Sequence, residues 1–134
     1  MGKMLTKRNY NSYLLCASSA IYLLVGLALI TKGFYLTVLL FLVTVFSVVH
    51  HLNFKNLGLK SLDWLFSALL IYYLFYVLKI GLGYYMLALL IVLGIFRLAD
   101  YVILKRGSYK IFNYTHSLWH LVSGLAIVFA VVFA

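Results

Sequence analysis

The chain has 134 residues, 66% of them hydrophobic, and its mean hydropathy is +1.10. Soluble domains are about 45–50% apolar, so this composition excludes an ordinary soluble domain and predicts an integral membrane protein. The net charge of +9 comes from basic residues that lie mostly at the ends of apolar segments, where they contact anionic lipid headgroups. The positive charge therefore indicates contact with a membrane surface, and we expect no nucleic-acid partner. The single cysteine, Cys16, excludes an intrachain disulfide and a cysteine-based metal site.

Five apolar segments follow one another along the chain, each long enough to cross about 30 Å of hydrocarbon. We expect helices over residues 13–31, 34–52, 61–79, 84–104 and 111–134. Short polar or glycine-containing turns separate them, and Ser61 is the expected N-cap of the third helix. The predicted fold class is therefore an all-α, polytopic membrane helix bundle that forms a single transmembrane domain, residues 1–134.

Positive charge predicts the orientation of this bundle. One side of the membrane receives the N-terminus and the loops after the second and fourth helices, which carry Lys3, Lys7, Arg8, Lys55, Lys60, Lys105, Arg106 and Lys110. The other side receives only Lys32 and Lys79. Because cytoplasmic loops are rich in lysine and arginine, we expect a cytoplasmic N-terminus and an external C-terminus.

This orientation brings the ionisable residues of the spans to one depth. The cytoplasmic ends of the second to fifth helices carry Ser47, His50, His51, Asp63, Arg97, Asp100, His116 and His120. Ionisable residues inside a membrane are costly and mark a functional site by default. Each also has a structural explanation on its own. Arg97 and Asp100 can pair with each other, Asp63 can favour a helix N-terminus, and Ser47 can bond a backbone carbonyl.

A separate structural role for each histidine does not readily explain why several of them lie in one layer. His116 and His120 lie four residues apart and therefore share one face of a helix. His50 and His51 point about 100° apart, so one of the two can join them. Three histidines from two helices, with water as fourth ligand, form a catalytic zinc site. A carboxylate close to such a site can accept a proton from the water.

The arrangement of these motifs resembles that of a known family. Ser47-x-x-x-His51 at the end of one helix, Asp63 at the start of the next, and His116-x-x-x-His120 opening the last helix resemble the motifs of the CREST superfamily of membrane hydrolases. This superfamily includes the alkaline ceramidases, the adiponectin-receptor-like (PAQR) proteins, the hemolysin III-like proteins and the myomaker-type proteins. The resemblance implies that His51, His116 and His120 bind Zn²⁺ and that Asp63 and Ser47 lie around the metal-bound water. It also implies a zinc site on the cytoplasmic side.

The family has seven helices, whereas this chain has room for five, and a homodimer is one way to complete the wall of a lipid cavity. The function expected from the sequence is zinc-dependent hydrolysis of an amide or ester of a membrane lipid. Two other classes remain open at this stage. One is a non-catalytic, receptor-like or scaffold membrane protein with a structural zinc site. The other is a haem protein with two axial histidines.

Overall fold

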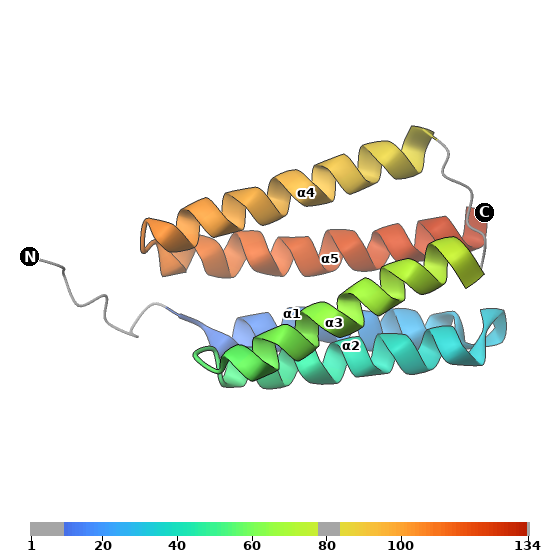
Figure 1. The fold of residues 1–134 in the computed structure, drawn as a ribbon, viewed down its shortest axis with the longest axis horizontal. Helices are drawn as coiled ribbons and strands as arrows, with labels where there is room; N and C mark the ends of the chain where they lie inside the picture. Colours follow the sequence, from blue (N-terminus) through green and yellow to red (C-terminus); the bar gives the residue numbers. More distant parts are fainter. Residues whose placement is uncertain (1–9, 78–83, 134) are drawn as a thin grey trace, which may run out of the picture.

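The computed structural model describes residues 10–77 and 84–133, and within them the chain is an all-α bundle of five α-helices (Figure 1). The helices are α1 (Ser12–Ala28), α2 (Phe34–Leu52), α3 (Leu57–Tyr72), α4 (Tyr84–Lys105) and α5 (Tyr109–Phe133). A 3₁₀ turn, Ile30–Lys32, follows α1, and a π-helical turn, Tyr73–Val77, extends α3.

Helix α2 has the bounds predicted for it, and the other helices differ at their ends. Helix α1 ends earlier than predicted because a 3₁₀ turn follows it. Helix α3 begins four residues earlier than predicted, since the side chain of Asn56 accepts a hydrogen bond from the backbone N–H of Leu59 at 3.2 Å. The prediction of Ser61 as N-cap is therefore wrong, and its hydroxyl donates to the carbonyl of Leu57 inside the helix. The predicted end of this helix at residue 79, the turn at 80–83 and residue 134 lie outside the described residues.

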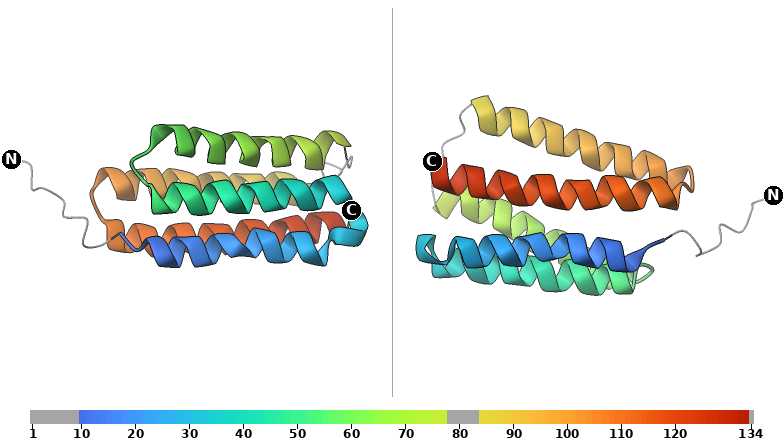
Figure 2. Two further views of the ribbon diagram at one scale, coloured as in Figure 1. Left: turned by 90° about the horizontal axis from the view of Figure 1, so that it is seen from below. Right: turned by 180° about the vertical axis from the view of Figure 1, so that it is seen from behind.

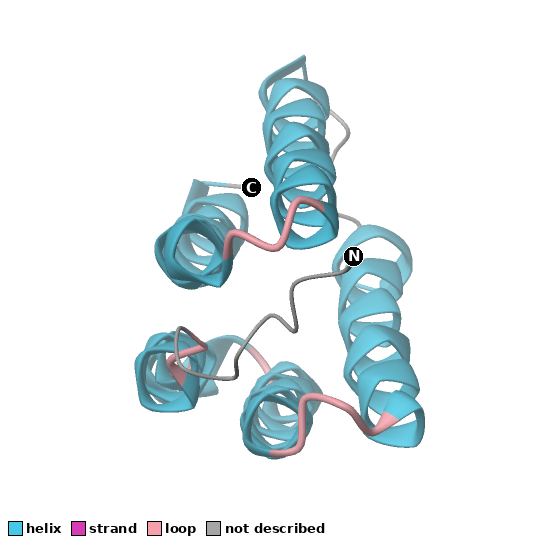
Figure 3. Cartoon of the chain, turned by 90° about the vertical axis from the view of Figure 1, so that its left-hand side faces the viewer, coloured by secondary structure: helices cyan, strands magenta, loops and turns pink. Residues whose placement is uncertain are grey.

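The helices form an open ring in the order α4, α5, α1, α2, α3, as the view along the bundle shows (Figure 3). Helix α1 packs between α2 and α5, α3 packs on the outer side of α2, and α4 packs on the outer side of α5 (Figure 2). Along their described lengths α3 and α4 make few contacts with each other. The ring therefore has one open side, between α3 and α4.

The outer surface of the bundle is apolar. Leu65 of α3, Ile95 of α4 and Phe129 of α5 are each more than half exposed, and many other large apolar side chains are also exposed. Among the described residues, three helical segments are long and apolar enough to cross a membrane: Phe34–Leu52, Leu57–Tyr76 and Tyr109–Phe133. Apolar exposure on this scale suits lipid and not water as the surrounding solvent. The chain is therefore a membrane protein.

The interior of the bundle is divided along its length. An apolar core, in which Leu36 and Leu40 are fully buried, fills the half that contains the α1–α2 connection. The opposite half contains buried serines, histidines and Asp100. The connection between α4 and α5 lies at this polar end and is only three residues long, because Gly107 adopts a φ of 73° and lets the chain reverse. This tight turn places the last turns of α4 directly beside the first turns of α5.

Candidate metal centre

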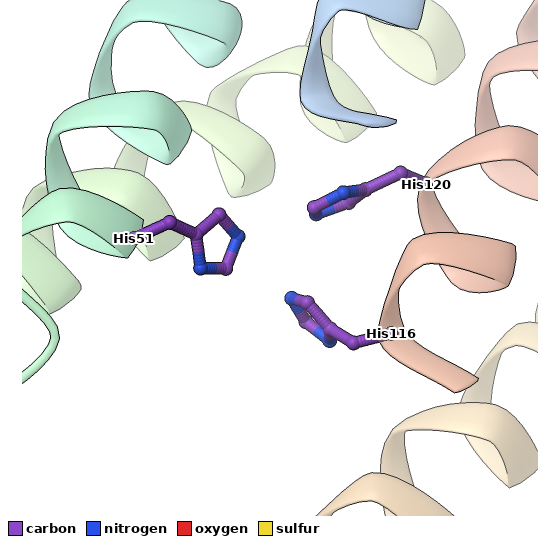
Figure 4. Close-up of side chains that lie close together, drawn as sticks. All are labelled: His51, His116 and His120. Carbon is purple, nitrogen blue, oxygen red and sulfur yellow. The ribbon is translucent and has the colours of Figure 1, made fainter. Parts of the chain in front are cut away.

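Three histidines meet in the polar half of the bundle. His51 comes from α2, His116 and His120 come from α5, and their rings point toward one another (Figure 4). One nitrogen of each ring lies within 4.8 Å of one nitrogen of each of the other two. All three side chains are buried. The four-residue spacing on α5 supplies two of the rings, and the packing of α2 across α1 supplies the third.

The hydrogen bonds of His120 define which of its nitrogens is free. Its Nδ1 lies 2.8 Å from Oγ of Ser18 and 3.3 Å from Oγ of Ser19, both on α1. Each serine already donates its proton to the carbonyl of Leu15, at 2.9 Å. Nδ1 of His120 must therefore be the donor in these bonds. Its Nε2 consequently carries a lone pair that can bind a metal.

His116 is held in the same tautomer by a carboxylate. Its Nδ1 donates to Oδ2 of Asp100 at 2.6 Å, and the hydroxyl of Thr115 donates to Oδ1 of the same carboxylate at 2.6 Å. Asp100 is only 2% exposed. A carboxylate that orients the outer nitrogen of a histidine is the usual support for a metal ligand, because it fixes the ring and makes Nε2 more basic.

The expected pairing of Asp100 with Arg97 is not what the structure shows. Within the described residues, Asp100 forms its ion pair with His116. The guanidinium of Arg97 lies over two tryptophan rings instead, with Cζ 5.5 Å from the centroid of Trp64 and 5.6 Å from that of Trp119. The short α4–α5 turn accounts for this, because it brings Asp100 opposite His116 across the two antiparallel helices.

His51, on α2, is the third histidine of the cluster. Its Nδ1 is 3.1 Å from the hydroxyl of Tyr10, which precedes α1, and its buried Nε2 has no hydrogen-bond partner in the part of the chain that the structure describes. Burial raises the pKa of Tyr10 above its usual range, so the hydroxyl stays neutral at physiological pH. An orphaned nitrogen in a buried site is costly, and a metal ion between the three rings would satisfy it.

The distances fit a zinc ion after a small contraction. Tetrahedral zinc holds its nitrogen ligands at about 2.0–2.1 Å, which places them about 3.3 Å from one another. The three nitrogens, all within 4.8 Å of one another, would each move inward by less than about 1 Å. Side-chain rotation alone covers such a shift. The chemistry also fits, since imidazole is a common ligand of zinc.

The neighbouring His50 is not part of this group. Its ring is buried against Phe54, with 6.2 Å between centroids, and its Nδ1 has no hydrogen-bond partner among the described residues. His50 and His51 diverge because successive residues on a helix are rotated by about 100°. The structure thus selects His51 from the two candidates on α2.

Ser47 and Asp63, the other two residues singled out in the sequence, form no hydrogen bond with the three histidines among the described residues. The hydroxyl of Ser47 is buried and lies 2.9 Å from that of Ser19. Because the proton of Ser19 goes to a backbone carbonyl, Ser47 donates in this bond and retains lone pairs that can accept. Asp63 is half-buried on α3, and its carboxylate is near enough to Tyr22 and Arg97 to interact with both electrostatically.

Sequence reasoning missed the contribution of α1 and of Asp100. Ser18 and Ser19 orient His120, and the hydroxyl of Tyr22 on the next turn bonds that of Ser123 at 2.5 Å. The serines carry no sequence signal, since serines within helices commonly bond their own backbone. A signal for Asp100 did exist. In an antiparallel pair joined by a short turn, residues equally far from the turn face each other, which brings Asp100 close to His116.

A pocket and a cavity lie near the histidines on different sides. A pocket of about 570 Å³ at the polar end reaches His51 and is lined by Tyr10, Phe54, Tyr109 and other residues. A smaller cavity, of about 110 Å³, is lined mainly by apolar side chains from all five helices, together with Tyr22. The ring of Tyr22 packs edge-on against that of His120, with 5.8 Å between centroids. The cluster thus lies between a pocket at the polar end of the bundle and an apolar cavity.

Comparisons with known proteins do not add to this picture. No protein-family model, no curated protein and no solved structure matches the chain.

Proposed function

We propose that the protein is a membrane-embedded, zinc-dependent hydrolase that cleaves an amide or ester bond of a lipid, as the resemblance to the CREST superfamily implies. The observation that carries this proposal is the arrangement of the three histidines. Separate groups engage each Nδ1, namely Tyr10, Asp100 and the Ser18–Ser19 pair. For His116 and His120 these bonds leave Nε2 as the ligand atom, and the free Nε2 of His51 completes the set.

The geometry favours a catalytic zinc site over the two alternatives. A structural zinc site is closed by four protein ligands, whereas the cluster offers three among the described residues. A haem with two axial histidines needs an open plane for the porphyrin between them. Here a third buried histidine lies within 4.8 Å of the other two and occupies such a plane.

In the proposed reaction the chain's own residues hold the reactants and move the proton. When bound, zinc acts as a Lewis acid and lowers the pKa of a water molecule to about 7. The three histidines fix its position. Asp63 takes the proton from the attacking water and passes it to the leaving nitrogen or oxygen. Ser47, whose own proton points to Ser19, accepts a hydrogen bond from that water, so its role is to hold the water and not an oxyanion.

The surroundings of the cluster support a lipid substrate. The apolar cavity beside Tyr22 and His120 suits an acyl chain, and the larger pocket at His51 gives water access from the membrane surface. A site that water and acyl chains reach from different sides suits hydrolysis at the edge of a bilayer. We place this end in the cytoplasm because the loops there carry Lys55, Lys60, Lys105, Arg106 and Lys110.

Metal analysis of purified protein tests the first half of the proposal. We expect one zinc per chain in the wild type and a large loss in His116→Ala and His120→Ala, with His50→Ala as the control because its ring lies outside the cluster. A wild type that copurifies with no zinc and binds none when it is added contradicts the proposal.

Release of fatty acid from a panel of ceramides and ester lipids tests the second half. We expect activity in the zinc-loaded wild type and a loss of at least about a hundredfold in Asp63→Ala, which is the usual scale for removing a general base. A zinc-loaded protein that hydrolyses none of the panel would favour the scaffold alternative. Full activity in Asp63→Ala would remove the role given to that carboxylate.

A further inference from the structure

Two basic side chains, one on α3 and one on α4, contact the same tryptophan ring. Nζ of Lys60 on α3 and Cζ of Arg97 on α4 each lie 5.5 Å from the centroid of the Trp64 ring. Arg97 also contacts the ring of Trp119 on α5, so it reaches from α4 toward both neighbouring helices. Lys60 lies in the first turn of α3 and Arg97 about two turns before the end of α4, both toward the polar end of the bundle. We call Lys60, Trp64, Arg97 and Trp119 the basic–tryptophan cluster.

Neither cation has a carboxylate partner. Within the described residues no carboxylate oxygen lies within 4.0 Å of either side-chain charge, and Asp63 acts on Arg97 only at longer range. Nη1 of Arg97 lies 3.3 Å from Nδ1 of His116, but that nitrogen already gives its proton to Asp100 and has no lone pair left to accept another. A guanidinium that has no carboxylate partner among the described residues is expensive within a membrane span and indicates a ligand.

We propose that Lys60 and Arg97 bind the phosphate group of a glycerophospholipid that enters from the bilayer between α3 and α4. Charge complementarity identifies the ligand, because arginine binds phosphate oxygens through two parallel hydrogen bonds and lysine adds a second positive charge. The tryptophans are the residues typical of the membrane interface, where phosphate groups lie. Trp119 contacts Arg97 and also lines the apolar cavity. The cavity is thus in place to take an acyl chain of the same lipid.

This site would define the substrate class of the hydrolase, an inference that rests on the proposed function. Nη1 of Arg97 lies 3.3 Å from Nδ1 of His116, so the guanidinium borders a ring that would hold the zinc. The ester carbonyls of a glycerophospholipid are a few bonds from its phosphate. With its phosphate on Arg97, such a lipid can present an ester carbonyl to the metal centre.

Intrinsic fluorescence can report on this site directly, because Trp64 and Trp119 are the only tryptophans of the chain. The probe is an ether-linked phosphatidic acid with brominated chains, which quenches tryptophan on contact and has no ester to hydrolyse. The comparison lipid is the matching brominated ether diglyceride, which lacks the phosphate. We expect the wild type in nanodiscs to be quenched at a several-fold lower mole fraction of the phosphate lipid than of the diglyceride.

The variants make the test specific. Lys60→Gln and Arg97→Gln should each raise the mole fraction for half-maximal quenching by the phosphate lipid about fivefold. Lys105→Gln is the matched control, because Nζ of Lys105 lies 6.0 Å from the ring of Tyr101 near the same end of α4 but contacts neither tryptophan. It should leave the quenching unchanged. A wild type that does not distinguish the two lipids overturns the inference, as does an equal effect of Lys105→Gln.

The quenching experiment can succeed or fail independently of the tests of zinc binding and hydrolysis. Ether lipids report binding whether or not the protein hydrolyses anything. Phosphate-dependent quenching without zinc or turnover would keep the lipid site and remove the hydrolase. Hydrolysis of neutral and anionic lipids at equal rates, unaffected by Arg97→Gln, would keep the hydrolase and overturn this assignment of its substrate.

Discussion

Asp100→Asn is the substitution that most directly tests how the bundle would prepare the proposed metal centre. The carboxylate accepts from His116 and from Thr115, each at 2.6 Å, and is buried between α4 and α5. Asparagine has nearly the same shape, so packing is preserved while the negative charge is lost. A hydrogen bond to an ionised acceptor is about twice as strong as one to a neutral acceptor. Removing such a partner from a histidine ligand lowers metal affinity by about 10- to 100-fold.

The zinc affinity of Asp100→Asn and of the wild type can be measured by competition with a chromophoric chelator in detergent. Asp63→Asn is a close control, because Asp63 is the only other acidic residue of the chain and forms no hydrogen bond with a histidine among the described residues. We expect the zinc affinity of Asp63→Asn to remain within about twofold of the wild type, well below the loss of about 10- to 100-fold expected for Asp100→Asn. Equal affinity in Asp100→Asn and the wild type would refute the argument that this carboxylate orients His116. So would an equal loss in both variants.

The remaining predictions concern other parts of the same structure. His51→Ala should reduce bound zinc as strongly as loss of a ligand on α5, whereas His50→Ala should keep it; zinc retained in His51→Ala would exclude His51 as a ligand. Gly124→Ala should destabilise the bundle by about 1–3 kcal/mol, since its Cβ would lie 2.8 Å from Cγ1 of Ile21 on α1; thermal unfolding in detergent measures this, and an unchanged Tm would show that α1 and α5 do not pack this closely. Burial raises the pKa of Tyr10 above its usual value of 10, so the stability that this neutral phenol contributes is present below pH 10 and is lost as the pH rises above it. Tyr10→Phe should therefore lose less stability than the wild type between pH 10 and 11, and parallel losses in the two proteins would show that the phenol is not buried in solution.

Much of the fold was predictable because hydrophobic length is a strong signal in a membrane protein. Five apolar segments separated by short polar turns leave few arrangements other than a helix bundle. Helix ends were less predictable because they depend on single side chains. Asn56 caps α3 five residues before Ser61, the predicted N-cap, whose hydroxyl instead bonds a carbonyl inside the helix.

At the candidate site, the sequence by itself determined that His116 and His120 share a face of α5, because a helix of 3.6 residues per turn brings residues four apart into register. It also predicted the common depth of the polar residues, because successive spans must alternate in direction. Only the tertiary structure decided between His50 and His51, since that choice depends on how α2 is rotated about its own axis when it packs on α1 and α3. It likewise decided that Asp100 supports His116 and leaves Arg97 without a carboxylate partner among the described residues. Such partnerships depend on the register between helices, which side-chain packing sets and periodicity does not specify.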